Sequence, residues 1–233
     1  MQHDAEKAYL AKPGSYFQGV RADYVDALPI APDAAILEIG CAEGGTGALA
    51  LESGKCARYV GIELHGPSAD IARTRLTEVH SGNIETMMLP FEAASFDALI
   101  ISEVLEHLID PWATMTRLAA LVRTGGLVFA SSPNVCHHRV IRNLLRGRWE
   151  LTERGVMDRT HLRWFTPRSY VRMFEEAGFA MEEVRPVSPP GWKSRLFNRL
   201  TGHRLAHLFI VQISIRGRKR PYTPDSYTPE SYG

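Results

Sequence analysis

Cysteine is scarce in this sequence, and long apolar runs are absent from it. The three cysteines, Cys41, Cys56 and Cys136, are far apart and form no CxxC pair, which argues against a disulfide framework or a cysteine-based zinc site. No apolar stretch approaches the roughly 20 residues that a membrane-spanning helix needs, and residues 1–4 lack the basic and apolar regions of a secretory leader. We therefore expect a reducing, cytoplasmic environment, no transmembrane segment and no bound metal ion.

A net charge of one sign is also lacking. The chain has 27 lysines and arginines against 26 aspartates and glutamates, so no overall field directs it to nucleic acid, and no nucleic-acid partner is expected. Its 233 residues, 45% of them hydrophobic, suffice for one domain with a sizeable core. Positive charge is instead local, with nine arginines against three acidic residues between His137 and Arg172. These arginines could bind an anionic acceptor bidentately, or they could form a solvated basic surface.

Short apolar runs alternate with amphipathic segments through the first part of the chain. Strands are predicted at residues 35–39, 59–62, 96–101 and 126–131, with a weaker one at 78–80, and helices at 67–77, at 111–121 and from the glycine-rich loop through residue 50. This alternation is typical of an α/β fold, a Rossmann-like, doubly wound and mostly parallel sheet with helices on both faces. A ligand of such a sheet binds outside the carboxyl ends of the strands.

The alternation ends after Pro133. We interpret residues 134–165 as a substrate-side insertion of helix and loop, followed by a helix from Pro167 to Ala177 with Thr166 as its N-cap. Residues 181–187 and 209–216 are predicted to be a closing antiparallel strand pair, and the amphipathic segment 191–209 either packs between them or lies on an anionic membrane. The resulting division is an N-terminal helical lid over residues 1–30, one domain over 31–217 and a disordered tail over 218–233.

The loop "ILEIGCAEGGTG", residues 36–47, lies where the first predicted strand turns into a helix, a place where backbone amide groups approach a ligand. A dinucleotide-binding pattern can be fitted from Gly45, but the strand ends near Ile39, and from Gly40 the pattern fails at Ala42. A P-loop is excluded because no Gly-Lys-Ser/Thr follows.

A loop that binds S-adenosylmethionine is the third possibility. This ligand presents a ribose and a zwitterionic amino acid rather than a pyrophosphate, so acidic residues at strand ends favour binding. Glu38 stands in the first strand, and Glu63 ends the second, where its two carboxylate oxygens could accept both ribose hydroxyls. Either glutamate could equally be a solvated acid at a strand end.

Four motifs together strengthen the third possibility. The segments "ILEIGCAEGGTG", "YVGIEL", "GNIETMMLPFEAASFDALIISEVLEHLIDP" and "LVRTGGLVFASSPN" resemble the successive motifs of class I S-adenosylmethionine-dependent methyltransferases. Residues 144–179, "LLRGRWELTERGVMDRTHLRWFTPRSYVRMFEEAGF", are similar to small methyltransferases associated with glycosyltransferases and polysaccharide biosynthesis. The resemblance covers about residues 15–187 and implies S-adenosyl-L-methionine as the cofactor.

The resemblance also implies the cofactor contacts. The first loop would line the methionyl part and ribose, the end of the second strand the ribose hydroxyls, the segment after the third strand the adenine, and the end of the fourth strand the methyl end. In that order, these residues are Glu38, Gly40, Cys41, Ala42 and Gly44; Glu63 and Leu64; Asn83 and Ile84; and Ser102 and Glu103. Ala42 replaces the usual middle glycine, a small intrusion that binding should survive. Asn83 replaces an aspartate, and its side-chain carbonyl would accept from the adenine amino group without charge.

Methyl transfer is an in-line displacement at carbon, so positioning supplies much of the catalysis, and a hydroxyl acceptor also benefits from a base. Histidine is the natural base near neutral pH. His161 in the insertion is the first candidate, and His107 after the fourth strand is the second. The candidate lid and substrate contacts are Tyr16, Arg21, Asp158 and Arg163. His161 could instead tie the insertion to the sheet, and His107 could cap or bridge backbone groups at the start of its helix. Tyr16 and Arg21 could belong to a helix that packs on the sheet edge.

The sequence therefore predicts a methyltransferase that O-methylates a glycan, a sugar nucleotide or a related small or lipid-linked acceptor. Two alternatives stay open at this point. One is an NAD-dependent dehydrogenase. The other is a non-catalytic binding protein that keeps the methyltransferase fold and contacts RNA through its arginine-rich insertion.

Overall fold

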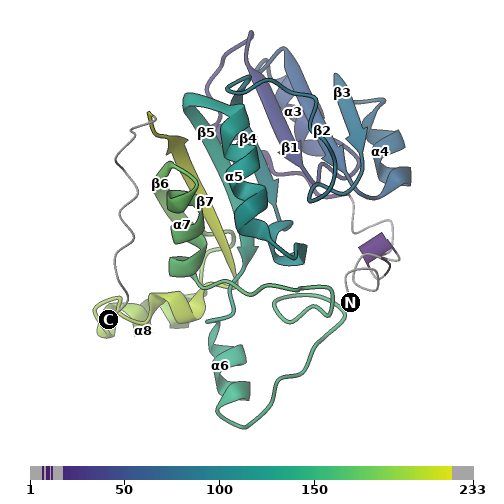
Figure 1. Ribbon diagram of the computed structural model, residues 1–233. Coiled ribbons are helices and arrows are strands. Elements are labelled where there is room, and N and C mark those ends of the chain that lie inside the picture. Colours follow the sequence, from purple (N-terminus) through teal and green to yellow (C-terminus); the bar gives the residue numbers. More distant parts are fainter. Residues whose placement is uncertain (1–6, 8, 11, 13–17, 222–233) are drawn as a thin grey trace.

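The computed structural model of the protein describes residues 7, 9, 10, 12 and 18–221. A seven-stranded sheet runs through the molecule in the order β3-β2-β1-β4-β5-β7-β6 (Figure 1). The strands are β1 Ala35–Ile39, β2 Arg58–Glu63, β3 Glu78–Ser81, β4 Phe96–Ser102, β5 Val122–Pro133, β6 Phe179–Pro186 and β7 Gln212–Lys219. Strands β1 to β5 pair in parallel, and β7 is antiparallel to both β5 and β6. The predicted Rossmann-like fold and its closing antiparallel pair are thus confirmed.

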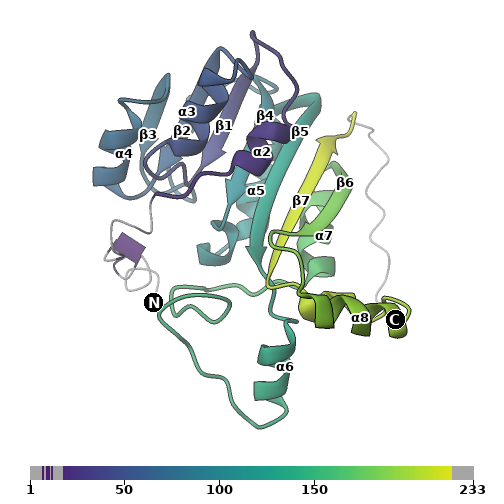
Figure 2. The ribbon, with the colours of Figure 1, turned by 180° about the vertical axis from the view of Figure 1, so that it is seen from behind.

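Helices cover both faces of the sheet. They are α2 Ala22–Ala27, α3 Gly45–Glu52, α4 Gly66–Ala72, the 3-10 helix η2 Leu105–His107, α5 Pro111–Leu121, α6 His138–Leu144, α7 Pro167–Glu176, α8 Trp192–Leu200 and the 3-10 helix η3 Ala206–Phe209. Helices α5 and α7 lie in front of the sheet in Figure 1, whereas α2 and α3 lie in front of it in the reverse view of Figure 2. Within the described part of the chain, no helix has the length and apolar character to cross a membrane.

The alternation of side chains along each strand divides the core into two layers. Leu37 and Ile39 of β1 pack with buried residues of α5 and α7 on one face. Ile36 packs on the other face with Tyr24 of α2 and Ala50 of α3. Because both faces are covered, the central strands are apolar on both sides, which is why they appear in the sequence as short continuous apolar runs.

Two elements differ from their predicted lengths by more than two residues. Helix α4 ends at Ala72, short of the predicted Thr77. The Thr77 hydroxyl accepts from the Tyr59 backbone N–H and donates to the Tyr59 carbonyl oxygen, both at 2.8 Å, which fixes the chain beside β2. Strand β5 is longer than predicted at both ends, because Val122 pairs with Phe96 of β4 and because Ser132 and Pro133 pair with β7.

The ends of the chain bear on the predicted division into lid, domain and tail. Strand β7 continues to Lys219 and so includes the first residues that were assigned to the tail. Residues 222–233 lie outside the described residues, as do residues 1–6 and 13–17 of the predicted lid. The division into lid, domain and tail therefore stays a prediction.

Candidate functional site

Two adjoining pockets open at the carboxyl ends of the parallel strands. The first extends from the ends of β1 and β2 to the segment after β3, and the second extends from the ends of β1 and β4 to the insertion. Tyr9, Gly40, Glu103, Val104 and His107 line both pockets. The order of the strands reverses between β1 and β4, because the chain continues from β1 to β2 on one side and from β4 to β5 on the other. A doubly wound sheet binds its ligand at this switch point.

The loop from β1 to α3 is left-handed at three positions, with φ of 71° at Gly40, 51° at Ala42 and 78° at Gly44. A Cβ at Gly40 would lie 2.5 Å from Val104 Cγ2, so this glycine is needed for close packing at the pocket rim. The difficulty at Ala42 is its conformation rather than its methyl group, because a left-handed L-residue costs about 1–2 kcal/mol. Gly44 lines neither pocket, and a Cβ there would lie 3.2 Å from the Ala72 backbone. Its predicted cofactor contact is unsupported, since the glycine lets α3 approach α4.

Glu63 ends β2 with a buried carboxylate that lines the first pocket. Its Oε2 accepts from the Ala42 backbone N–H and its Oε1 from the His65 backbone N–H, both at 2.8 Å. Burial raises the pKa of Glu63, and these backbone hydrogen bonds oppose the rise. Each oxygen keeps a further lone pair for a ligand, so the carboxylate is a fixed double acceptor.

Glu38 lies beneath the same loop and lines the second pocket. Its side chain is buried and accepts from the Tyr59 hydroxyl at 2.9 Å. Burial raises the pKa of Glu38 to about 7, and the negative charge of Glu63 adds to the rise. A cation in the second pocket would therefore shift Glu38 toward its ionised form.

The predicted adenine contacts, Asn83 and Ile84, line the first pocket together with Leu64. Asn83 Oδ1 accepts from the Glu85 backbone N–H at 2.9 Å. The side-chain carbonyl expected to face the adenine amino group thus already holds a turn, and it retains one lone pair. Cys41 lines the second pocket with a thiol whose pKa burial raises.

Arg21 brings a guanidinium group to the second pocket from the start of α2. Its Nη1 donates to Ser102 Oγ at 2.7 Å and to Ser131 Oγ at 2.9 Å. Its Nε and Nη2 donate to the Asp23 carboxylate, each at 2.9 Å, and the guanidinium lies 3.6 Å from the centre of the Tyr24 ring. These contacts hold Arg21 in one orientation beside Ser102, the predicted contact to the methionyl end.

Glu103 stands at the junction of the two pockets and has a φ of 55°. This conformation is uncommon for a residue other than glycine, and such outliers cluster at functional sites. Glu103 Oε2 accepts from Gln212 Nε2 at 2.9 Å, whereas Oε1 is buried without a hydrogen-bond partner among the described residues. Burial raises the pKa of Glu103, and hydrogen bonds from Ser131 and Gln212 oppose the rise.

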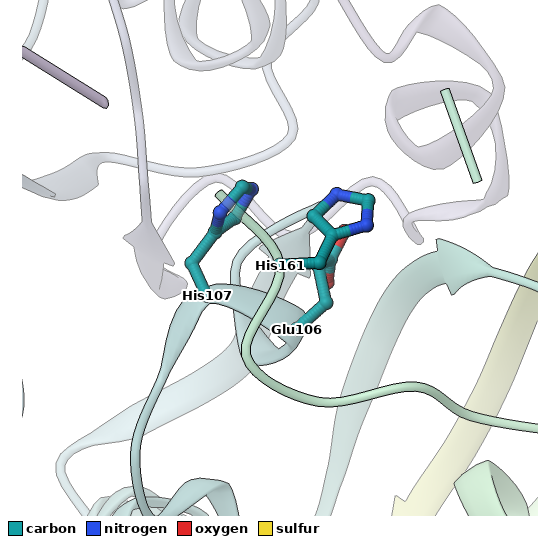
Figure 3. Close-up of side chains that lie close together, drawn as sticks. All are labelled: Glu106, His107 and His161. Atoms are coloured by element: carbon teal, nitrogen blue, oxygen red, sulfur yellow. The ribbon is translucent and has the colours of Figure 1, made fainter. Parts of the chain in front are cut away.

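The insertion is fastened across η2 and brings the two candidate bases together. The Leu162 and Arg163 backbone N–H groups donate to the Glu106 carbonyl oxygen at 2.8 and 3.0 Å. His161 then lies beside His107, with ring centroids 4.9 Å apart (Figure 3). Both rings line the second pocket.

The protonation of the two rings follows from their neighbours. His107 Nδ1 lies 3.2 Å from the Thr160 carbonyl oxygen, and His161 Nδ1 lies 3.2 Å from the Val156 carbonyl oxygen. A carbonyl oxygen only accepts, so each Nδ1 carries the proton and each Nε2 keeps a lone pair. Burial lowers the pKa of His107 to about 4, with His161 adding to the shift, and burial also lowers the pKa of His161. Both rings are therefore neutral near pH 7 and can accept a proton or bind a cation.

Glu106 is a site residue that sequence analysis missed. Its buried carboxyl lines the second pocket, where Oε2 accepts from Ser132 Oγ at 3.2 Å and Oε1 lacks a partner among the described residues. Burial raises the pKa of Glu106 well above its usual range, and the charge of Glu103 adds to the rise. Glu106, His107 and His161 together can hold a metal ion, because their ligand atoms lie within 4.8 Å of one another. The motif "EVLEHL" contains the signal, an acid directly before His107.

The remaining candidate contacts have mainly structural roles or cannot be placed. Asp158 lines the second pocket, but its carboxylate pairs with Lys12 Nζ at 2.6 Å. Arg163 lines neither pocket, and its guanidinium donates to the Ile109 carbonyl oxygen. Tyr16 lies outside the described residues. Asp158 thus links the insertion to Lys12, and Arg163 links it to the segment between η2 and α5.

Comparisons with known proteins identify the family of the chain. A family model described as a methyltransferase domain matches residues 14–184. The chain is 28% identical over 185 residues to a ubiquinone biosynthesis O-methyltransferase of Aromatoleum aromaticum, covering 76% of this chain and 77% of that relative. It is 30% identical over 180 residues to the protein of the same name from Thiobacillus denitrificans, covering 74% of this chain and 76% of that relative.

A solved structure of an S-adenosylmethionine-dependent methyltransferase from Archaeoglobus fulgidus has the same fold. It superimposes with a TM-score of 0.63 at 16% identity, covering 88% of this chain and 96% of that chain. At this identity the likeness concerns the fold, while the family model and the sequence relatives carry the assignment. The chain therefore belongs to the methyltransferase-domain family, and it is a class I S-adenosylmethionine-dependent methyltransferase.

Proposed function

We propose that the enzyme transfers the methyl group of S-adenosylmethionine to a hydroxyl oxygen of a small organic acceptor. The observation that carries this proposal is the pair of neutral imidazoles, His107 and His161, beside the buried carboxyl of Glu106. All three groups line the second pocket, and His107 also lines the first. The hydroxyl of an acceptor in the second pocket would thus lie beside these three groups. It would reach the methyl group of the cofactor at the junction of the two pockets.

The cofactor is proposed to occupy the first pocket, the junction and the adjoining part of the second pocket beside Glu38 and Arg21. Glu63 would accept the ribose hydroxyls, and Asn83 and Ile84 would flank the adenine, as their positions in the lining allow. At the other end, Glu38 would attract the methionyl ammonium, and Arg21, already bound to Ser102 Oγ, would bind the methionyl carboxylate. The sequence-based proposal of Arg21 as an acceptor contact is thereby changed to a cofactor contact.

The reaction then needs alignment and a partner for one proton. An oxygen lone pair of the acceptor forms the new bond to the methyl carbon, while the carbon–sulfur electron pair stays on the sulfur and leaves neutral S-adenosylhomocysteine. In its simplest form, Nε2 of His161 takes the hydroxyl proton, and His107 is the second candidate. A lowered histidine pKa keeps the ring unprotonated, and so available, below neutral pH.

Two classes of acceptor fit the second pocket. A mostly apolar acceptor such as a hydroxylated aromatic ring is favoured by Val156, Val187, Val211 and Pro133 in the lining, and the relatives are O-methyltransferases named for ubiquinone biosynthesis. A glycan, sugar nucleotide or lipid-linked precursor is favoured by the resemblance of residues 144–179 and by the exposed Arg154 in the same lining. We put the aromatic hydroxyl first, because apolar atoms contribute more of the surface of the second pocket than polar atoms do.

The test uses S-adenosylmethionine with a labelled methyl group and a matched panel of catechols, sugar nucleotides and amines. The proposal predicts label on oxygen, first among the catechols. Transfer to the sugar nucleotides alone would select the second acceptor class. Transfer only to nitrogen or carbon would overturn O-methylation.

A further inference from the structure

Three side chains with metal-binding atoms converge under the second pocket. Glu106 and His107 extend from η2, and His161 extends from the insertion segment that crosses it (Figure 3). One carboxylate oxygen and two imidazole nitrogens lie within 4.8 Å of one another. Ligand atoms about 2.1 Å from one ion can be at most about 4.2 Å apart, so small side-chain rotations would complete the site.

Both imidazoles are already held as metal ligands usually are. In metal sites the second ring nitrogen commonly donates to a backbone carbonyl, which fixes the tautomer and directs the other nitrogen to the ion. Nδ1 of His107 and of His161 lie 3.2 Å from the Thr160 and Val156 carbonyl oxygens, so both Nε2 lone pairs are available. A histidine acting alone as a base would need only one ring arranged in this way.

Two polar atoms of these three side chains lack a partner among the described residues. His107 Nε2 and Glu106 Oε1 are buried and have no hydrogen bond among the described residues. Leaving such buried groups unpaired destabilises the folded chain. The nearby ammonium of Lys12 does not supply the missing charge, because it pairs with Asp158 at 2.6 Å and donates to the Glu153 carbonyl oxygen at 2.9 Å. A cation between the three side chains would give both orphaned atoms a partner.

We infer that Glu106, His107 and His161 bind one divalent first-row transition-metal ion, such as zinc, cobalt, manganese or iron. Two imidazoles and one carboxylate favour these ions over magnesium and calcium, which prefer oxygen ligands. Three protein ligands leave at least one coordination position open, as in catalytic metal sites. Because all three side chains line the second pocket, the open position faces the acceptor.

This inference deepens the proposed function and rests on it for the role of the ion. An ion that binds the acceptor oxygen lowers the pKa of the hydroxyl, as it does for bound water. The hydroxyl proton then leaves to solvent instead of to a ring, and the oxygen forms its bond to the methyl carbon as before. In the metal-bound enzyme the two histidines are ligands of the ion, so the ion takes the place of His161 as the group that activates the hydroxyl. The earlier expectation of no metal considered cysteine ligands and overlooked this cluster.

The test measures metal binding without cofactor or acceptor. The full-length protein is freed of metal by dialysis against EDTA and titrated with cobalt(II), while visible absorption and the melting temperature are recorded. We expect saturation at one equivalent, a d–d absorption band of a nitrogen–oxygen site and a higher melting temperature. Magnesium should neither raise the melting temperature nor displace cobalt.

Matched variants locate the ion. Glu106→Gln, His107→Ala and His161→Ala should each weaken cobalt binding by about 100-fold or more, because each removes a direct ligand. His138→Ala, which alters an exposed histidine outside both pockets, should leave binding unchanged. If His107→Ala or His161→Ala fails to fold, His107→Asn or His161→Asn replaces it.

Three results would overturn the inference. These are no stoichiometric binding by the wild type, full binding by the ligand variants, and loss of binding in His138→Ala. None of these results bears on O-methylation, which is measured by label transfer. If label transfer persists in the presence of EDTA, His161 remains the direct base. Conversely, cobalt binding with label only on nitrogen would uphold the metal site and overturn the proposed acceptor.

Discussion

The cofactor half and the acceptor half of the site are built in different ways. In the cofactor half, the side chains follow directly on the strand ends, as Glu63 does on β2, and neighbouring backbone amides hold them. In the acceptor half, contacts join distant parts of the chain: Lys12 to Asp158 across 146 residues, and His107 to Thr160 across 53. The first half is a consequence of the sheet, whereas the second depends on where the insertion comes to lie.

The two halves also differ in how well their polar groups are satisfied. Both Glu63 oxygens accept a backbone N–H at 2.8 Å. In the acceptor half, Glu106 Oε1 and His107 Nε2 are buried without a partner among the described residues. Groups left unpaired in this way are poised for a ligand, so perturbing them should alter the chemistry and leave cofactor binding intact.

The largest effect is expected in the acceptor half. Replacing His161 by alanine should lower kcat by about 10²–10⁴-fold, because the hydroxyl loses either its base or a ligand of the ion that activates it. Affinity for S-adenosylhomocysteine, measured by calorimetry, should stay at the wild-type value, and His138→Ala serves as the control. An equal loss of cofactor affinity would mean that His161 has a structural role, and the two halves would not be separable.

The second effect is expected in the cofactor half. Glu63→Ala should weaken S-adenosylhomocysteine binding by about 100-fold, because two hydrogen bonds from ribose hydroxyls to a charged group are lost. Glu78→Ala, at a carboxylate on the β3 edge that pairs with Arg58, is the matched control and should bind normally. If Glu63→Ala bound S-adenosylhomocysteine with wild-type affinity, Glu63 would not be a ribose contact.

A third effect concerns pH. Burial raises the pKa of Glu38 to about 7, so the carboxyl is neutral below that pH and ionised above it. Affinity for S-adenosylhomocysteine, with its ammonium beside Glu38, should therefore rise about tenfold between about pH 6 and pH 8. Glu38→Gln should flatten this profile in a calorimetric titration. The same slope in the variant would show that another group titrates.

The smallest effect is expected at Ala42, whose φ is 51°. Ala42→Gly should stabilise the fold by about 1 kcal/mol, measured by urea unfolding, because glycine adopts this conformation without the Cβ clash. Ala94→Gly, at an exposed residue with φ of 56° outside both pockets, should give a similar gain. Neither change should tighten cofactor binding much. A large gain in affinity for S-adenosylhomocysteine in Ala42→Gly alone would mean that Ala42 weakens cofactor binding by this loop.

The same comparison explains what the sequence could predict. The βα alternation and the "ILEIGCAEGGTG" loop determine where the strands end, so the predicted residues Glu38, Gly40 and Glu63 do lie in the pocket linings. Gly44 shows the limit even there, because its role depends on contact with Ala72 in the next helix. Spacing alone cannot distinguish a glycine that faces a ligand from one that faces a helix.

The acceptor half was predicted less well because its geometry is set by long-range contacts. His107 and His161 were both named as candidate bases, but their proximity depends on two backbone hydrogen bonds from the insertion to Glu106. Nothing in the local pattern signals that Arg163 would turn away to the Ile109 carbonyl oxygen. Glu106 had a visible signal in "EVLEHL", an acid beside a histidine, and only the fold shows that its carboxyl is buried.

The central claim is that the strand edge holds S-adenosylmethionine through Glu63, separately from the acceptor chemistry. It is tested most directly by thermal unfolding with S-adenosylhomocysteine and NAD side by side, since a ligand of the folded state raises the melting temperature. The account predicts a clear rise with S-adenosylhomocysteine for the wild type and His161→Ala, a much smaller rise for Glu63→Ala, and none with NAD. No rise with S-adenosylhomocysteine at millimolar concentration, or an equal rise with NAD, would contradict it.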